Sequence, residues 1–185
     1  MTFRDLIDDA VNVADIPSSP HLKVVRVQPG LVYRVVCRSE KALVLQIHYH
    51  NRRTFPCVIA ECPACKKAPP RRYAYVPVSN IAHGSEGHVF GLELPDAAFE
   101  HIRAEVYRDQ KVEQRSMLGI EIEVHRSQRR LRSPLDITVG GRMENVSCFD
   151  LQKLFEALVR MWGLPKPMND EPITTWFDRV RPMMF

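Results

Sequence analysis

Residues 48–80 read HYHNRRTFPCVIAECPACKKAPPRRYAYVPVSN, and they carry the most specific signal in the chain. The segment holds three cysteines within nine residues and two histidines just before them: Cys57, Cys62, Cys65, His48 and His50. A C-x-x-C pair forms a tight turn that brings two sulfur atoms to one zinc ion, and a third cysteine with a histidine completes a tetrahedral set. We therefore predict one structural Zn²⁺ per chain, in a zinc knuckle at about residues 48–70.

Either of the two histidines can complete the set, because strand alternation places His48 and His50 on the same face. We favour His48, since the eight residues between it and Cys57 allow the loop to fold back over the end of the strand. A redox C-x-x-C pair and ordinary buried thiols are the alternatives, but no thioredoxin-like pattern surrounds these cysteines. A zinc deaminase is disfavoured because no H-x-E triplet occurs upstream of the C-P-A-C pair.

Strand-like segments flank the knuckle on both sides. The expected strands cover residues 31–50 (broken at 39–41), 71–80, 88–94, 119–125 and 134–140, and a helix is expected at 95–107. A helix between the third and fourth of five strands is the order of the OB-fold barrel, which binds oligonucleotides. We predict a mainly β protein with α-helices: a five-stranded OB-fold barrel with an inserted zinc knuckle and flanking N- and C-terminal helices.

This fold divides the chain of 185 residues into three parts. Residues 1–30 are expected to form an N-terminal helix and an extended lead-in. Residues 31–145 form the OB fold with its knuckle. Residues 146–185 are expected to form a C-terminal helix, at about 148–163, followed by a tail interrupted by prolines.

Positive charge is concentrated in two short segments of a chain whose formal net charge is only +4. The segment 48–80 contains six basic side chains and a single acid, Glu61. The segment 126–132, RSQRRLR, contains four arginines and no acid. Basic clusters on an otherwise neutral body indicate a polyanionic partner at one surface.

Aromatic residues accompany the basic clusters. Tyr73 and Tyr75 alternate with Ala74 and Val76, so they are expected on the outer face of their strand, where bases can stack on the rings while arginine and lysine contact phosphates. Packing against a terminal helix is the alternative for these rings. The candidate nucleic-acid contacts are Arg52, Arg53, Phe55, Lys66, Lys67, Arg71, Arg72, Tyr73, Tyr75, Arg129, Arg130 and Arg132.

Over about residues 43–140 the chain resembles the single-stranded-DNA-binding proteins of T-even bacteriophages, which carry a zinc knuckle after the first strand of an OB fold. The resemblance lies in the His…Cys…Cys-x-x-Cys spacing and in the segments CPACKKAPPRRYAYVPVSN and GHVFGLELPDAAFEHI. The zinc-bearing OB fold in the large subunit of eukaryotic replication protein A has a related arrangement. The resemblance implies sequence-tolerant binding of single-stranded DNA in the replication or recombination of a phage or mobile element.

Other function classes are weighed against this expectation. An enzyme is not expected, because the sequence contains no Walker loop, no nucleophile motif and no carboxylate set for two metals. RNA in the same groove, or a guide-complex accessory role, is one alternative. A zinc-stabilised adaptor that binds a protein partner through its C-terminal helix or tail is another. We expect a cytoplasmic protein, since the acidic N-terminus is no signal peptide and no window is apolar enough for a membrane span.

Overall fold

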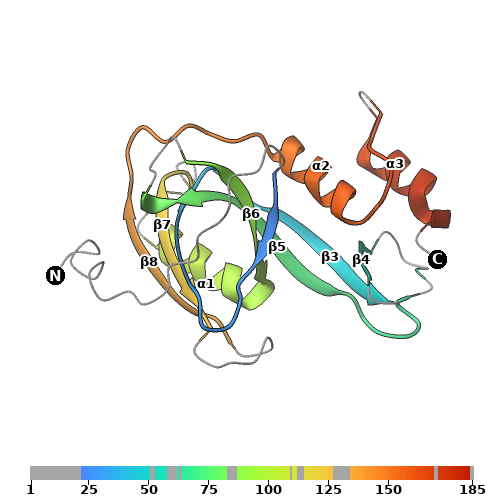
Figure 1. Ribbon diagram of the computed structural model, residues 1–185, viewed down its shortest axis with the longest axis horizontal. Helices are drawn as coiled ribbons and strands as arrows, with labels where there is room; N and C mark the ends of the chain where they lie inside the picture. Colours follow the sequence, from blue (N-terminus) through green and yellow to red (C-terminus); the bar gives the residue numbers. More distant parts are fainter. Residues whose placement is uncertain are drawn as a thin grey trace.

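The computed structural model describes residues 22–50, 53–57, 62, 64–82, 87–108, 110–111, 115–126, 134–168 and 171–183 (Figure 1). The strands are β1 (Val24–Arg26), β2 (Val32–Cys37), β3 (Leu43–His50), β4 (Arg53–Pro56), β5 (Arg71–Asn80), β6 (Val89–Pro95), β7 (Ile120–His125) and β8 (Asp136–Arg142). The helices are α1 (Asp96–Tyr107), α2 (Leu151–Met161), α3 (Ile173–Val180) and the short 3-10 helix η4 (Arg181–Met183). The predicted mainly β composition with helices is confirmed, whereas the predicted N-terminal helix lies outside the described residues. No helix in the described ranges is long and apolar enough to cross a bilayer.

The strands form one mixed sheet that follows the path β1–β6–β5–β2–β7–β8, with β3 attached to β5 and β4 attached to β3. β1 lies parallel to β6, and the other pairs are antiparallel. β5 is long enough to pair with β3 near its start and with β2 near its end. Across the described strands the sheet stays open, with β1 and β8 at its two ends, so the predicted closed five-stranded barrel is not confirmed.

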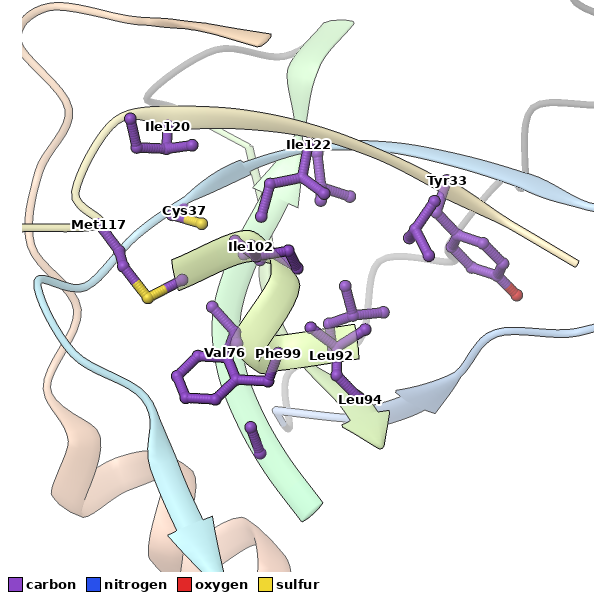
Figure 2. Close-up of a cluster of buried hydrophobic side chains, with 14 of the residues drawn as sticks. Tyr33, Cys37, Val76, Leu92, Leu94, Phe99, Ile102, Met117, Ile120 and Ile122 are labelled. Carbon is purple, nitrogen blue, oxygen red and sulfur yellow. The ribbon is translucent and has the colours of Figure 1, made fainter. Parts of the chain in front are cut away.

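The first core lies between the sheet and α1. Alternating apolar residues of β2, β5, β6 and β7 point into it, and Figure 2 shows Phe99 and Ile102 of α1 among the side chains of these strands. Ile122 on β7 and Leu92 on β6 are completely buried there. Burying each such side chain contributes about 1.5–3 kcal/mol, so this core stabilises the central sheet.

The second core lies on the opposite face of β3 and β5, where α2 and α3 cover the sheet. Its buried members are Ile47, Tyr75, Leu154, Phe155, Leu158, Val159, Trp162, Trp176 and Val180. Helix α2 begins at an N-cap where Asp150 Oδ1 accepts a hydrogen bond from Gln152 N at 2.8 Å, an arrangement that satisfies a free amide of the first turn. The expectation of a helix at 148–163 is confirmed. Within the expected tail interrupted by prolines the structure has a further helix, α3, which places Trp176 in this core.

Glycine at position 91 allows α2 to approach β6 closely. A Cβ atom built on Gly91 would lie 2.5 Å from Leu154 Cδ1, which is closer than two carbon atoms can approach. Leu154 is completely buried. Leu154 of the second core therefore packs directly against the backbone of β6 at Gly91.

Replacing Gly119 with alanine should destabilise the fold. Gly119 has a φ of +80°, and its Cβ would collide with the carbonyl oxygen of Met143. We expect Gly119→Ala to lower the free energy of unfolding by at least about 2 kcal/mol, from the left-handed backbone and the collision together. Gly141→Ala is the matched control, because nothing lies within 4 Å of that Cβ. Equal denaturant midpoints for the two variants would contradict the turn at Gly119.

Candidate metal centre

The hairpin of β3 and β4 brings two of the predicted ligands together. His48 lies opposite Phe55 in the β3–β4 register, and the centroids of the two rings are 5.7 Å apart. Just beyond β4, the amide of Cys57 donates a hydrogen bond to Gln46 O at 2.7 Å. This bond continues the strand pairing by one residue, and the thiol of Cys57 is thereby held near the imidazole of His48.

The C-x-x-C segment supplies the other two ligands from a compact turn. The amide of Cys65 donates to Cys62 O at 3.0 Å, and the amides of Lys67 and Ala68 donate to Ala64 O, each at 3.0 Å. Cys62 and Ala64 pack against Phe55 in a small apolar cluster. The turn thus fits beneath the hairpin and presents both sulfur atoms to β3.

The four side chains His48, Cys57, Cys62 and Cys65 have the spacing of a tetrahedral metal site. Their ligand atoms all lie within 4.8 Å of one another, with Cys65 Sγ 3.3 Å from His48 Nε2 and 3.5 Å from Cys57 Sγ. Zinc bonds of about 2.3 Å to sulfur and 2.0–2.1 Å to nitrogen require edges of about 3.5–3.8 Å in a tetrahedron. The four residues, named here the metal quartet, could therefore hold a metal ion after only small shifts. The side chain of the alternative ligand, His50, lies outside the described part of the structure.

Burial shifts the pKa of two members of the quartet, His48 and Cys57. His48 is 3% exposed, and burial lowers the pKa of its imidazole, which keeps the ring neutral and able to donate a lone pair. Burial, with the neighbouring Cys65 and Cys62 thiols, raises the pKa of Cys57 to about 12. Several thiolates packed together are unfavourable without a positive charge among them, so a cation bound at their centre would stabilise the deprotonated form.

The predicted cations differ in how they are placed. Lys66, Lys67 and Arg71 are exposed, and none of them forms an ion pair within the described residues. Arg72 is already engaged, since its Nη1 lies 3.1 Å from Asp96 Oδ1 and 3.9 Å from Glu100 Oε1.

The remaining predicted arginines are less completely described. Arg53 belongs to β4, but its side chain lies outside the description. Arg52 and the arginines of the 126–132 segment named as contacts, Arg129, Arg130 and Arg132, fall outside the described residues altogether.

Two of the predicted stacking rings, Phe55 and Tyr75, are buried in this structure and do not face solvent. Phe55 is 5% exposed because it packs against Cys62 and Ala64 beneath the metal quartet. Tyr75 is 1% exposed because α2 and α3 cover its face of β5. The hydroxyl of Tyr75 donates to Glu93 Oε2 at 3.4 Å, and burial raises the pKa of this phenol. Tyr73 is half-buried at the margin of the second core.

An exposed ring that was not among the predicted contacts lies on β3. Tyr49 is 72% exposed, although it shares a strand face with Leu43, Leu45 and Ile47. Alternation alone places Tyr49 on this apolar face, which is why the sequence pattern suggests a core residue. Its position near the strand end, beyond Ile47, the last aliphatic residue of that face, is the signal that could have identified Tyr49 as exposed.

Comparison with known proteins found no relative of this chain. No protein-family model, no curated protein and no solved structure matches the chain.

Proposed function

We propose that the chain is a cytoplasmic, sequence-tolerant single-stranded-DNA-binding protein that serves the replication or recombination of a phage or mobile element and has no chemistry of its own. The observation that carries this proposal is the juxtaposition of the metal quartet with cations that form no ion pair among the described residues. Lys66 and Lys67 directly follow Cys65, and Arg71 begins the next strand. A metal ion at the quartet would therefore fix the position of the segment that carries these exposed positive charges. Such a surface suits the phosphates of a nucleic acid.

Zinc is the metal that the donor set favours. Three cysteine sulfurs and one imidazole nitrogen are soft to intermediate donors, which select zinc over calcium or magnesium. With four protein ligands no coordination position remains open for a water molecule or substrate. We therefore assign one zinc a structural role, in which metal binding fixes the connection between β4 and β5.

The arrangement of strands supports a modified OB fold. The path β6–β5–β2–β7–β8, with α1 between β6 and β7, is consistent with the five-strand order predicted from the sequence, if β2 and β3 together act as the first strand. In this view β1 pairs with the edge of β6 at which a closed barrel would have another of its five strands. We propose the fold of the T-even single-stranded-DNA-binding proteins, suggested by the cysteine spacing, as the analogy for this arrangement.

Salt dependence tests the proposed function directly. Each phosphate neutralised on a single strand contributes a slope of about −0.7 to a plot of log affinity against log salt concentration. With Lys66, Lys67 and Arg71 each at a phosphate, affinity should fall roughly 20-fold between 50 and 200 mM salt. The measurement is fluorescence anisotropy with a labelled oligothymidylate of about 20 nucleotides, a span that exceeds the site size of one OB fold.

Competitor strands separate the alternatives. Equal competition by unlabelled oligouridylate would show that the same surface also binds RNA, whereas stronger competition by duplex DNA would contradict single-strand binding. Absence of binding to any of these at low salt would overturn the proposed function. The adaptor alternative is weakened by α2, whose apolar residues Leu154, Phe155 and Leu158 are already covered by the chain itself.

A further inference from the structure

The outer face of β3 changes from buried to exposed within two residues. Ile47 is 4% exposed and belongs to the second core, whereas Tyr49, the next residue on the same face, is 72% exposed. The rise along a strand places these two positions about 6.6 Å apart. The cover formed by α2 and α3 therefore ends between them, and the phenol ring of Tyr49 stands at the edge of the cover.

The strand register gives Tyr49 a cationic neighbour. Ile47 pairs directly with Arg71 of β5, so Arg71 is the diagonal neighbour of Tyr49 on the same face. Diagonal positions are about 7–8 Å apart, a distance that an aromatic ring and a long side chain can span. Arg71 is exposed and forms no ion pair within the described ranges.

The other neighbours of Tyr49 on this face carry no negative charge. Thr54 of β4 lies directly opposite it, and Pro56 lies opposite Ile47. The acids that neutralise the adjacent Arg72 lie on α1, at Asp96 and Glu100. Because Arg72 alternates with Arg71 along β5, those carboxylates lie toward the opposite face of the strand, and no carboxylate in the described part of the chain pairs with Arg71.

We propose that Tyr49 and Arg71 form a contact for one nucleotide of a single strand, in which a base stacks on the phenol ring and the guanidinium contacts the adjoining phosphate. This inference rests on the proposed function and places its contact at the tip of β3 instead of at Tyr75. An unpaired strand fits because its bases are free to stack, whereas those of a duplex are already stacked. A protein partner is less suited, since the charges of Arg71, Lys66 and Lys67, which form no ion pair with any residue that the structure describes, all have the same sign.

Substitution of the ring tests the contact. Tyr49→Ala should weaken binding of the labelled oligothymidylate roughly 5- to 100-fold, the usual effect of losing one stacked base, and Tyr49→Trp should stay within about threefold of the original protein. Met168→Ala is the control for an exposed apolar side chain, because Met168 is 63% exposed elsewhere on the surface. It should leave affinity unchanged.

Substitution of the cation tests the second half of the proposal. Arg71→Ala should reduce the magnitude of the salt slope by about 0.7, the share of one phosphate, whereas Arg108→Ala, at the C-cap of α1, should leave the slope unchanged. Arg108 is exposed like Arg71, so the two variants remove the same charge. An unchanged slope for Arg71→Ala would overturn the assigned phosphate contact.

The outcomes separate this inference from the function on which it depends. If the original protein does not bind the oligonucleotide, both fail. If it binds, and Tyr49→Ala binds equally well, the nucleotide contact at Tyr49 is overturned while the proposed function stands. Should Tyr49→Ala lower the melting temperature, Tyr49→Thr decides, because threonine keeps a high strand propensity without the ring and should show the same loss of affinity.

Discussion

Cys65→Ser should abolish binding of the proposed zinc and loosen the connection between β4 and β5. The sulfur of Cys65 lies within 3.5 Å of both His48 Nε2 and Cys57 Sγ, so it is central to the metal quartet. A serine hydroxyl is not ionised at neutral pH and replaces a thiolate poorly. Metal binding in so short a loop is coupled to its folding. We therefore expect the free energy of unfolding to fall by more than about 4 kcal/mol, as is typical when a protein loses a structural metal.

Elemental analysis and thermal unfolding measure this effect together. The original protein, purified without chelator, should contain about one zinc per chain, because the quartet offers one closed site of four protein ligands. Cys65→Ser should contain almost none. Cys148→Ser is the control, because Cys148 is exposed and does not belong to the quartet. Metal-free original protein with fully reduced thiols would contradict the assignment of a metal site.

Tyr75→Ala should destabilise the protein strongly without a specific effect on nucleic-acid affinity. The ring is buried in the second core, so its removal leaves a cavity between β5 and the covering helices. Truncating a buried aromatic side chain costs about 3–5 kcal/mol. Tyr75→Phe keeps the ring and loses only the hydrogen bond to Glu93, which should cost about 1 kcal/mol.

Denaturant unfolding and oligonucleotide binding of the same preparations distinguish burial from stacking. Burial predicts a large fall in the free energy of unfolding for Tyr75→Ala and normal affinity in the fraction that folds. A base-stacking role for Tyr75 predicts the reverse, a near-normal stability with weakened binding. The second result would show that α2 and α3 leave the face of β5 when nucleic acid binds.

Local sequence patterns predicted most of the strands, the helices α1 and α2, and the members of the metal quartet. Alternation correctly placed Ala74 and Val76 on one face of β5 and Tyr75 on the other, since side-chain direction depends only on the strand period. The ligands were recognisable because a C-x-x-C turn is a local structure. In each case the information lies within a few neighbouring residues.

What covers a face depends on residues far away in the chain, and the sequence pattern did not reveal it. The burial of Tyr75 requires α2 and α3, and α3 is a helix of only 8 residues in a segment rich in prolines. Gly91 was a usable clue, since a glycine inside a strand often marks a close approach of another element. The short strand β4 was also missed, because its four residues end at Pro56 inside an expected loop.

Neighbouring residues of β3 serve opposite sides of the molecule: Ile47 belongs to the second core, and His48 to the metal quartet. A slip of β3 by one residue along β5 would turn His48 toward the helices and bring an isoleucine or tyrosine to the cysteines. Neither side chain binds a metal ion through nitrogen or sulfur. With zinc bound at the quartet as proposed, metal retention would discriminate between correctly and incorrectly paired chains, and the zinc content of a refolded sample would report the fraction whose β3 has found its proper register.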